Sequence, residues 1–350
     1  MKERGVRVAS TNYLLGEGYW VGIIPLASGS SGIEIVVDPR FHAPERIRTL
    51  DAAVEWLHEL EPQLGRAIDA RRGQSDGFVT VDNPAYGCER VYSPQRWCLT
   101  GAAATFTDQL YSPGSDFIAL GNTFVTDLVT RDLDGEDISG RLEFYNRDFQ
   151  TFFAAYLVMF AGQYPAFGNQ QVMGPKLLWD FSAYWSISAL RFVGGKLTDM
   201  RFTQAVQAHL LTSFQLTLRL QELFKQWSEL APPEQRPGFV SMSDIPVVLD
   251  KQARLAAPVA SDEELVALFA ANARFLQAVA VLIFHEALRS LPGHAIDDDQ
   301  GLNPLAVGLD PGRWQEDGLF DDSGISLSEA RELAPGVEDG WRDQAEAAPR

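Results

Sequence analysis

The stretch that decides the fold is GAAATFTDQLYSPGSDFIALGN, residues 101–122. It follows the apolar run Trp97-Cys98-Leu99, and apolar residues then recur at helical spacing at Phe117, Leu120, Phe124 and Leu128. This pattern predicts a strand, a loop of small residues and a helix that begins near the Ser-Pro-Gly-Ser sequence. The unpaired N–H groups and partial positive charge of such a helix start suit a phosphate, a carboxylate or the electron-rich edge of a flavin ring.

Two other sequences accompany this stretch, RWCLTG at residues 96–101 and GYWVGIIPL at residues 18–26. Together with YSPGSDFIALGN, residues 111–122, they resemble the C-terminal portion of FAD-dependent oxidoreductases of the tryptophan-halogenase-like family, from about residue 11 to about residue 230. The resemblance implies that a strand-to-loop segment contacts the flavin ribityl chain and that the loop with its helix lies against the isoalloxazine ring. The cofactor-binding residues implied are Gly101, Ala102, Ser112, Pro113, Gly114 and Ser115.

The chain departs from this family at three places. It contains no G-x-G-x-x-G loop, whose glycines let a backbone approach a pyrophosphate, and Gly16-Glu17-Gly18 has the wrong spacing. Ala102 stands where the family has an acidic residue, and Gly22 stands at the second tryptophan of the W-x-W-x-I-P signature. The resemblance therefore implies a truncated, halogenase-like flavoprotein that lacks its dinucleotide-binding half, with FAD binding weak or absent in the isolated chain.

The composition excludes several classes of function. The 350 residues carry a formal net charge of −18, which argues against a nucleic-acid partner because phosphate binding needs clustered Lys and Arg. No uncharged apolar run reaches the ~18 residues that cross a bilayer. The charged start of the chain lacks an apolar signal segment, so we expect a cytoplasmic protein. The five histidines are scattered and predict no metal site, and no catalytic residues can be assigned.

The chain changes character along its length, and we predict an α+β fold. Residues 1–133 form a sheet-rich segment with the flavin-cradle loop and helix, 134–296 a helical domain, and 297–350 an acidic, irregular or disordered tail. Within the first part, residues 18–26 and 32–38 read as a hairpin and 49–60 as a helix. Within the second, long apolar periodicity predicts helices at 137–161, 176–192, 201–230 and 261–291.

The helical part is rich in aromatic residues, which allows two interpretations. In the family that the chain resembles, this region shapes a pocket for an apolar or aromatic substrate, and the residues implied are Trp20, Trp179, Tyr184 and Trp185. The alternative is that these side chains pack as core between helices.

Two functions from different classes remain open. The chain is either part of an FAD-dependent oxidoreductase that acts on a small apolar or aromatic molecule, or a non-catalytic descendant that binds such a molecule or a protein. The missing half would leave an unpaired edge or apolar face, so we expect a separate FAD-binding half or a second copy of the chain as partner.

Overall fold

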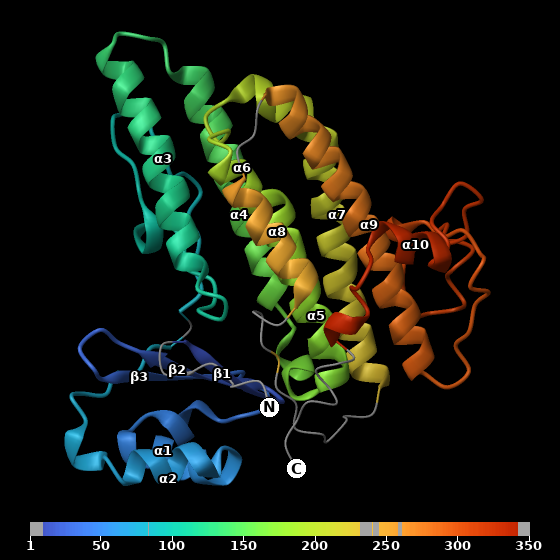
Figure 1. Cartoon of the computed structure of the whole chain (residues 1–350). Coiled ribbons are helices and arrows are strands. Elements are labelled where there is room, and N and C mark those ends of the chain that lie inside the picture. Colours follow the sequence, from blue (N-terminus) through green and yellow to red (C-terminus); the bar gives the residue numbers. More distant parts are fainter. Residues whose placement is uncertain (1–9, 83, 232–239, 241–244, 258–260, 342–350) are drawn as a thin grey trace. The chain divides into compact units, whose positions relative to one another are not determined.

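The fold is taken from a computed structural model, which describes residues 10–82, 84–231, 240, 245–257 and 261–341 (Figure 1). The chain divides into two compact units, Met1–Ala85 with Tyr164–Gly168, and Tyr86–Gln163 with Asn169–Arg350. We call them the N-terminal unit and the helical unit and describe each by itself. The described strands all belong to the N-terminal unit, and the predicted α+β class is confirmed. The domain boundaries predicted near residues 133 and 296 stay predictions.

The N-terminal unit contains a three-stranded antiparallel sheet in the order β1-β2-β3. The strands are β1 (Asn12–Gly16), β2 (Tyr19–Pro25) and β3 (Ser31–Val37), and Tyr19 pairs with Val37. The hairpin predicted from residues 18–26 and 32–38 is confirmed. Gly18 permits the turn between β1 and β2, because its φ of 78° is left-handed and a Cβ would lie 2.3 Å from the Cβ of Phe41.

Helices close one face of this sheet. They are η2 (Pro44–Ile47), α1 (Leu50–Leu60) and α2 (Pro62–Asp69), and the exposed turn η3 (Arg72–Gln74) follows them in the chain. Tyr19 and Val21 alternate onto this face and pack against Trp56 and Leu57 of α1. The Thr49 side chain caps α1 by accepting from the Ala52 N–H, which confirms the predicted helix.

The strand predicted just before the loop of small residues is wrong, and β3 is the last strand among the described residues. Trp97-Cys98-Leu99 is not a strand, because Cys98 makes only an isolated bridge to Tyr92 across a tight turn. Cys88 and Cys98 are both free thiols, and Cys98 is exposed.

The helical unit confirms the helices predicted from periodicity. Its elements are η4 (Gly101–Ala103), α3 (Pro113–Leu133), α4 (Ser139–Phe160), α5 (Gln170–Ala183), the π-helical turn η6 (Tyr184–Ser188), α6 (Ala189–Val193), α7 (Met200–Leu230), α8 (Pro246–Ala256), α9 (Asp262–Ser290), η8 (Pro304–Ala306) and α10 (Leu327–Leu333). The segment η5 (Tyr164–Gly168), between α4 and α5 in the chain, belongs to the N-terminal unit.

Helix α9 is the most apolar element of the helical unit. It lies beside α7 and contacts α5 and α10 (Figure 1). The Ser261 side chain caps its start by accepting from the Glu264 N–H, as the sequence predicted. By length and composition α9 could cross a membrane, and 61% of its most apolar window is buried within the chain. Burial of this kind is typical of the core helix of a folded domain.

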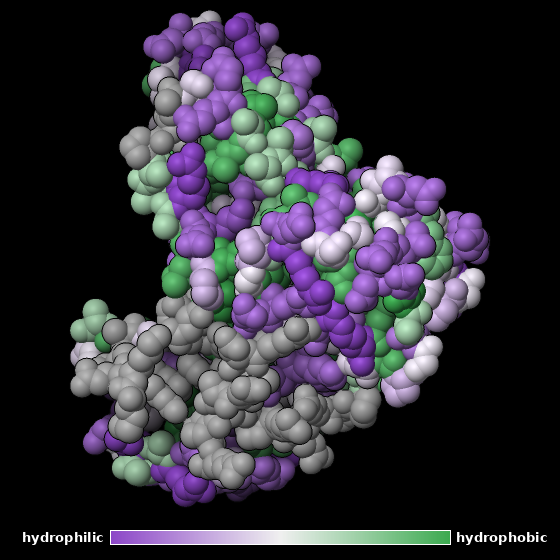
Figure 2. Space-filling model, turned by 45° about the vertical axis from the view of Figure 1, so that its right-hand side comes forward, coloured by the Kyte–Doolittle hydropathy of each residue, from purple (hydrophilic) through white to green (hydrophobic). Residues whose placement is uncertain are grey.

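Residues 297–341 belong to the helical unit and are largely irregular apart from η8 and α10. Leu302 forms bridges to Phe320 and Ile325, and Leu302, Leu319 and Ile325 are fully buried. Regularly placed aliphatic residues therefore give this acidic segment enough apolar surface to fold. Figure 2 shows the surface of the helical unit in its upper part, where hydrophobic groups lie among hydrophilic ones.

Candidate functional site

The helical unit contains an aromatic cavity of about 140 Å³ between α4, α5, η6 and α7. Most of its wall is aromatic or aliphatic. The side chains of this kind are Phe152, Tyr156, Met159, Trp179, Tyr184, Ile187, Leu210 and Phe214. An engineered cavity of about 150 Å³ with an apolar lining binds benzene, so the aromatic cavity is the right size for one six-membered ring.

Charged residues at the wall of the aromatic cavity are paired within the protein. Asp148 and Arg191 form an ion pair at 2.8 Å, and the Arg191 guanidinium also donates to the Thr203 hydroxyl. Asp180 pairs with Lys176 one helical turn earlier, at 2.8 Å, and both side chains are 1% exposed. The cavity therefore offers no uncompensated charge from these residues to a ligand.

Further hydrogen bonds hold the Lys176–Asp180 pair in place. The Lys176 ammonium also donates to the Gln221 side-chain oxygen at 2.6 Å, and the Gln221 amide donates to Asp180 at 2.7 Å. The Tyr111 hydroxyl donates to Asp180 at 3.2 Å. Burial raises the pKa of Asp180 and lowers the pKa of Lys176, and their mutual attraction opposes both changes. The network connects α5 to α7 and fixes two walls of the cavity.

A second carboxylate joins two tyrosines that line the cavity. Asp116, in the first turn of α3, accepts from the Tyr156 hydroxyl at 2.6 Å and from the Tyr184 hydroxyl at 3.0 Å. Burial, followed by the Asp116 charge, raises the pKa of both tyrosines well above its usual range. Both hydroxyls therefore stay protonated at neutral pH and orient their rings toward the cavity wall.

The remaining polar groups at the cavity wall offer a ligand few hydrogen bonds. The Ser213 and Thr217 hydroxyls donate to backbone carbonyls of α7, which leaves their oxygens as acceptors. The Trp179 indole N–H is fully buried and has no hydrogen-bond partner in the described structure. An aromatic ring with one polar substituent fits a wall that is apolar and carries a few such neutral groups.

The structure brings together two of the four residues predicted for a substrate pocket. Trp179 and Tyr184 line the aromatic cavity. Trp185 lines a different pocket, beside α8. Trp20 belongs to the N-terminal unit, where its indole donates to the Tyr164 hydroxyl at 3.1 Å. Substrate binding by these residues stays a prediction.

The predicted flavin cradle is assembled from η4 and the start of α3, which pack together. A Cβ on Gly101, whose φ is 50°, would lie 2.6 Å from the Ile118 side chain. The Tyr86 hydroxyl donates to the carbonyl oxygen of Ala102, so this carbonyl already has a hydrogen-bond partner within the protein. Ser112, Gly114 and Ser115 are exposed and Pro113 is buried.

These residues do not fit a complete FAD site. Ala102 has no side-chain acceptor for ribityl hydroxyls, and the space beside Gly101 is filled by Ile118. The start of α3 has no side-chain cap, which leaves helix N–H groups there available to an acceptor. FAD binding by Gly101, Ala102 and Ser112–Ser115 therefore stays a prediction, and we derive no chemistry through the cofactor.

The structure also bears on Gly22 and on metal binding. A Cβ on Gly22 would lie 3.2 Å from the Trp20 ring, so the space for a second tryptophan side chain is already lined by the first. Among the described residues, no group of three His, Cys, Asp or Glu side chains could hold a metal ion. Reasoning from the sequence did not single out Asp148 and Arg191 as residues of this site.

The chain is similar to the flavin-dependent halogenase chlA of Dictyostelium discoideum. The two are 25% identical over 190 residues, which is 53% of this chain and 31% of that protein. The chain thus matches about a third of the length of this curated relative. No family model and no solved structure matches the sequence. The match supports a distant relationship to halogenase-like flavoproteins.

Proposed function

We propose that this chain is the substrate-binding part of a flavin-dependent oxidoreductase and that the aromatic cavity binds a small aromatic molecule. The observation that carries the proposal is a single-ring-sized cavity walled by Phe152, Tyr156, Trp179, Tyr184 and Phe214, with its charges paired inside the protein. The similarity to a flavin-dependent halogenase supports the oxidoreductase class.

The chain's own residues would bind and orient the aromatic molecule and exclude water from it. Aromatic walls favour offset or edge contacts with a bound ring. The Ser213 and Thr217 hydroxyl oxygens at the cavity wall can accept from one polar substituent, and that interaction would give an otherwise apolar cavity a preferred ligand orientation. Flavin would supply the redox chemistry from a dinucleotide-binding part outside this sequence.

The binding step is tested by titrating the purified chain with phenol and with its saturated counterpart cyclohexanol, followed by calorimetry. We expect phenol to bind more tightly. Ala155→Phe, which fills the cavity from α4, should abolish phenol binding, because Ala155 lines the cavity. Ala154→Phe is the matched control, since the neighbouring alanine does not line the cavity. Equal phenol binding by both variants, or none by the wild type, would refute the proposal.

The flavin part is tested by the visible absorption spectrum of the chain after mixing with FAD and gel filtration. We expect no retained flavin, because Ala102 and Gly101 provide no contact for the ribityl chain. Retained flavin absorbance would show that the cradle suffices without a dinucleotide-binding part, and that part of the proposal would then be wrong.

A second candidate function is binding of the aromatic molecule without any redox chemistry. The observation that favours it is the use of the Ala102 carbonyl by Tyr86 in the loop that resembles a flavin contact. The adjacent coding DNA separates the two candidates. A neighbouring segment that encodes G-x-G-x-x-G supports the oxidoreductase, and its absence supports the binding protein.

A further inference from the structure

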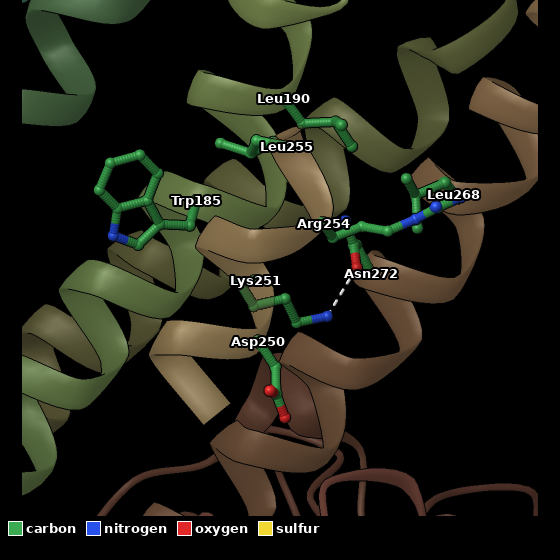
Figure 3. Close-up of a pocket in the computed structure, with 8 residues that line it drawn as sticks. All are labelled: Trp185, Leu190, Asp250, Lys251, Arg254, Leu255, Leu268 and Asn272. Atoms are coloured by element: carbon green, nitrogen blue, oxygen red, sulfur yellow. Dashed lines mark hydrogen bonds between the residues drawn. The ribbon is translucent and has the colours of Figure 1, made fainter. Parts of the chain in front are cut away.

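A second pocket of the helical unit, of about 160 Å³, lies between α8, α9 and the segment formed by η6 and α6. We call it the Lys251 pocket (Figure 3). Its apolar wall includes Leu190, Leu255 and Leu268. Its polar groups come from α8 and from Asn272 of α9. The pocket is thus apolar on one side and carries a cation on the other.

Lys251 is held in a fixed position at this pocket. Its ammonium donates to the Asn272 side-chain oxygen at 2.7 Å, and the two side chains point toward one another in Figure 3. The same nitrogen lies 4.0 Å from the centre of the Phe275 ring. Asn272 is itself oriented, because its amide donates to the Ser186 carbonyl at 2.8 Å. The lysine is therefore preorganised by neutral partners.

No described carboxylate forms an ion pair with Lys251. Asp250 is exposed, and its carboxylate points away from Asn272 in Figure 3. Arg254, the other cation at the pocket, pairs with Glu264 at 3.3 Å. Burial lowers the pKa of Lys251 to about 8, and the Asp250 charge opposes this change only in part. A partly desolvated ammonium without a counter-ion is a receptor for an anionic group.

We propose that the Lys251 pocket binds a small organic acid as its carboxylate. The carboxylate would pair with the Lys251 ammonium, and the hydrocarbon body would lie against Leu190, Leu255 and Leu268. A ligand of this kind supplies both the missing negative charge and the apolar contact. The proposal does not depend on the function of the aromatic cavity.

The test is calorimetric titration of the full chain with benzoate and with its uncharged analogue benzamide at pH 7. We expect benzoate to bind more tightly than benzamide. Lys251→Met should weaken benzoate binding by at least about tenfold, since a hydrogen bond to a charged group is lost. Lys251→Arg should retain part of the affinity, because it keeps a cation. Lys225→Met, at a lysine outside the pocket, is the matched control and should bind like the wild type.

A pH series separates an ion pair from apolar binding. Affinity for benzoate should fall as pH rises through about 8, where Lys251 loses its proton, and binding near this pH should take up protons. Among the described residues, the other charged groups at the pocket are Asp250 and Arg254 on α8, and Glu264 of α9, which pairs with Arg254. Lys251 is therefore the group whose titration the affinity should follow.

Three outcomes would overturn the proposal. They are equal affinity for benzoate and benzamide, unchanged benzoate binding by Lys251→Met, and no binding at millimolar benzoate. The Ala155→Phe variant distinguishes the two cavities. Benzoate binding that survives this substitution belongs to the Lys251 pocket, and binding that is lost with it belongs to the aromatic cavity.

Discussion

The two cavities of the helical unit differ in how they treat buried charge. At the aromatic cavity, Asp148 pairs with Arg191 and Asp180 pairs with Lys176. At the Lys251 pocket, the lysine contacts an amide and an aromatic ring, and no described carboxylate neutralises it. The first cavity can therefore distinguish ligands by shape and apolarity, whereas the second can distinguish them by charge.

The same difference predicts opposite roles for two lysines. Lys176 satisfies a buried carboxylate, so its ammonium is required by the fold. Lys251 satisfies no carboxylate, and its desolvation is a cost that a ligand could offset. Lys→Met is the same change at both positions and removes the ammonium while keeping most of the length of the side chain, so it compares these roles directly.

The largest expected effect is that of Lys176→Met. It leaves Asp180 buried without its counter-ion, and breaking a buried pair costs about 3–5 kcal/mol of folding free energy. Urea unfolding of the full chain should show a strongly lowered midpoint. The double variant Lys176→Met, Asp180→Leu removes both charges and should recover much of the loss. A single variant as stable as the wild type would show that the pair is not needed by the fold.

Lys251→Met should have a smaller effect that depends on pH. The pKa of Lys251 is about 8 in the folded chain and about 10.4 in an unfolded chain, so between these values the unfolded state binds more protons. The stability contributed by this residue therefore rises with pH over that window. The wild type should gain relative to Lys251→Met by about 1 kcal/mol, less than the full linkage value because the ammonium is partly solvated.

Urea midpoints of both proteins at pH 7.5 and 10 check this prediction. The comparison is made between proteins at each pH, because other residues titrate in both. Lys225→Met again serves as a control, since this lysine pairs with Glu222 at 3.7 Å. A difference between wild type and Lys251→Met that stays constant with pH would mean that Lys251 is solvated like a surface lysine.

Much of the fold was predictable because long helices repeat their apolar residues many times. Helices α3, α4, α7 and α9 were all expected from spacing, and the caps Thr49 and Ser261 act where the sequence placed helix starts. Helix α8 was missed because its 11 residues give only three turns of pattern. The strand expected at Trp97–Leu99 was wrong because a short apolar run needs a neighbouring strand to pair with.

The candidate site was less predictable because its partners are distant in the sequence. Asp116 meets tyrosines 40 and 68 residues away, and Lys251 meets an asparagine 21 residues away on another helix. The Lys176–Asp180 pair did leave a signal, since opposite charges four residues apart in an apolar helix point to one another. Tyr184 was expected at a pocket because it is aromatic, whereas its hydrogen bond to Asp116 could not be predicted from the sequence.

The smallest effects concern the tyrosines at the aromatic cavity and test whether its wall is held by internal pairing. Tyr156→Phe and Tyr184→Phe each remove one hydroxyl from Asp116, and each should cost about 1 kcal/mol in urea unfolding. Because both hydroxyls share one carboxylate, the double variant should deviate from the sum of the single effects by at least about 0.5 kcal/mol. Tyr86→Phe with Tyr184→Phe is the additive control, since Tyr86 bonds to Ala102 instead. Additive effects for the first pair would show that the two tyrosines act separately. The wall would then be held by the packing of their rings, and phenol binding should survive both substitutions.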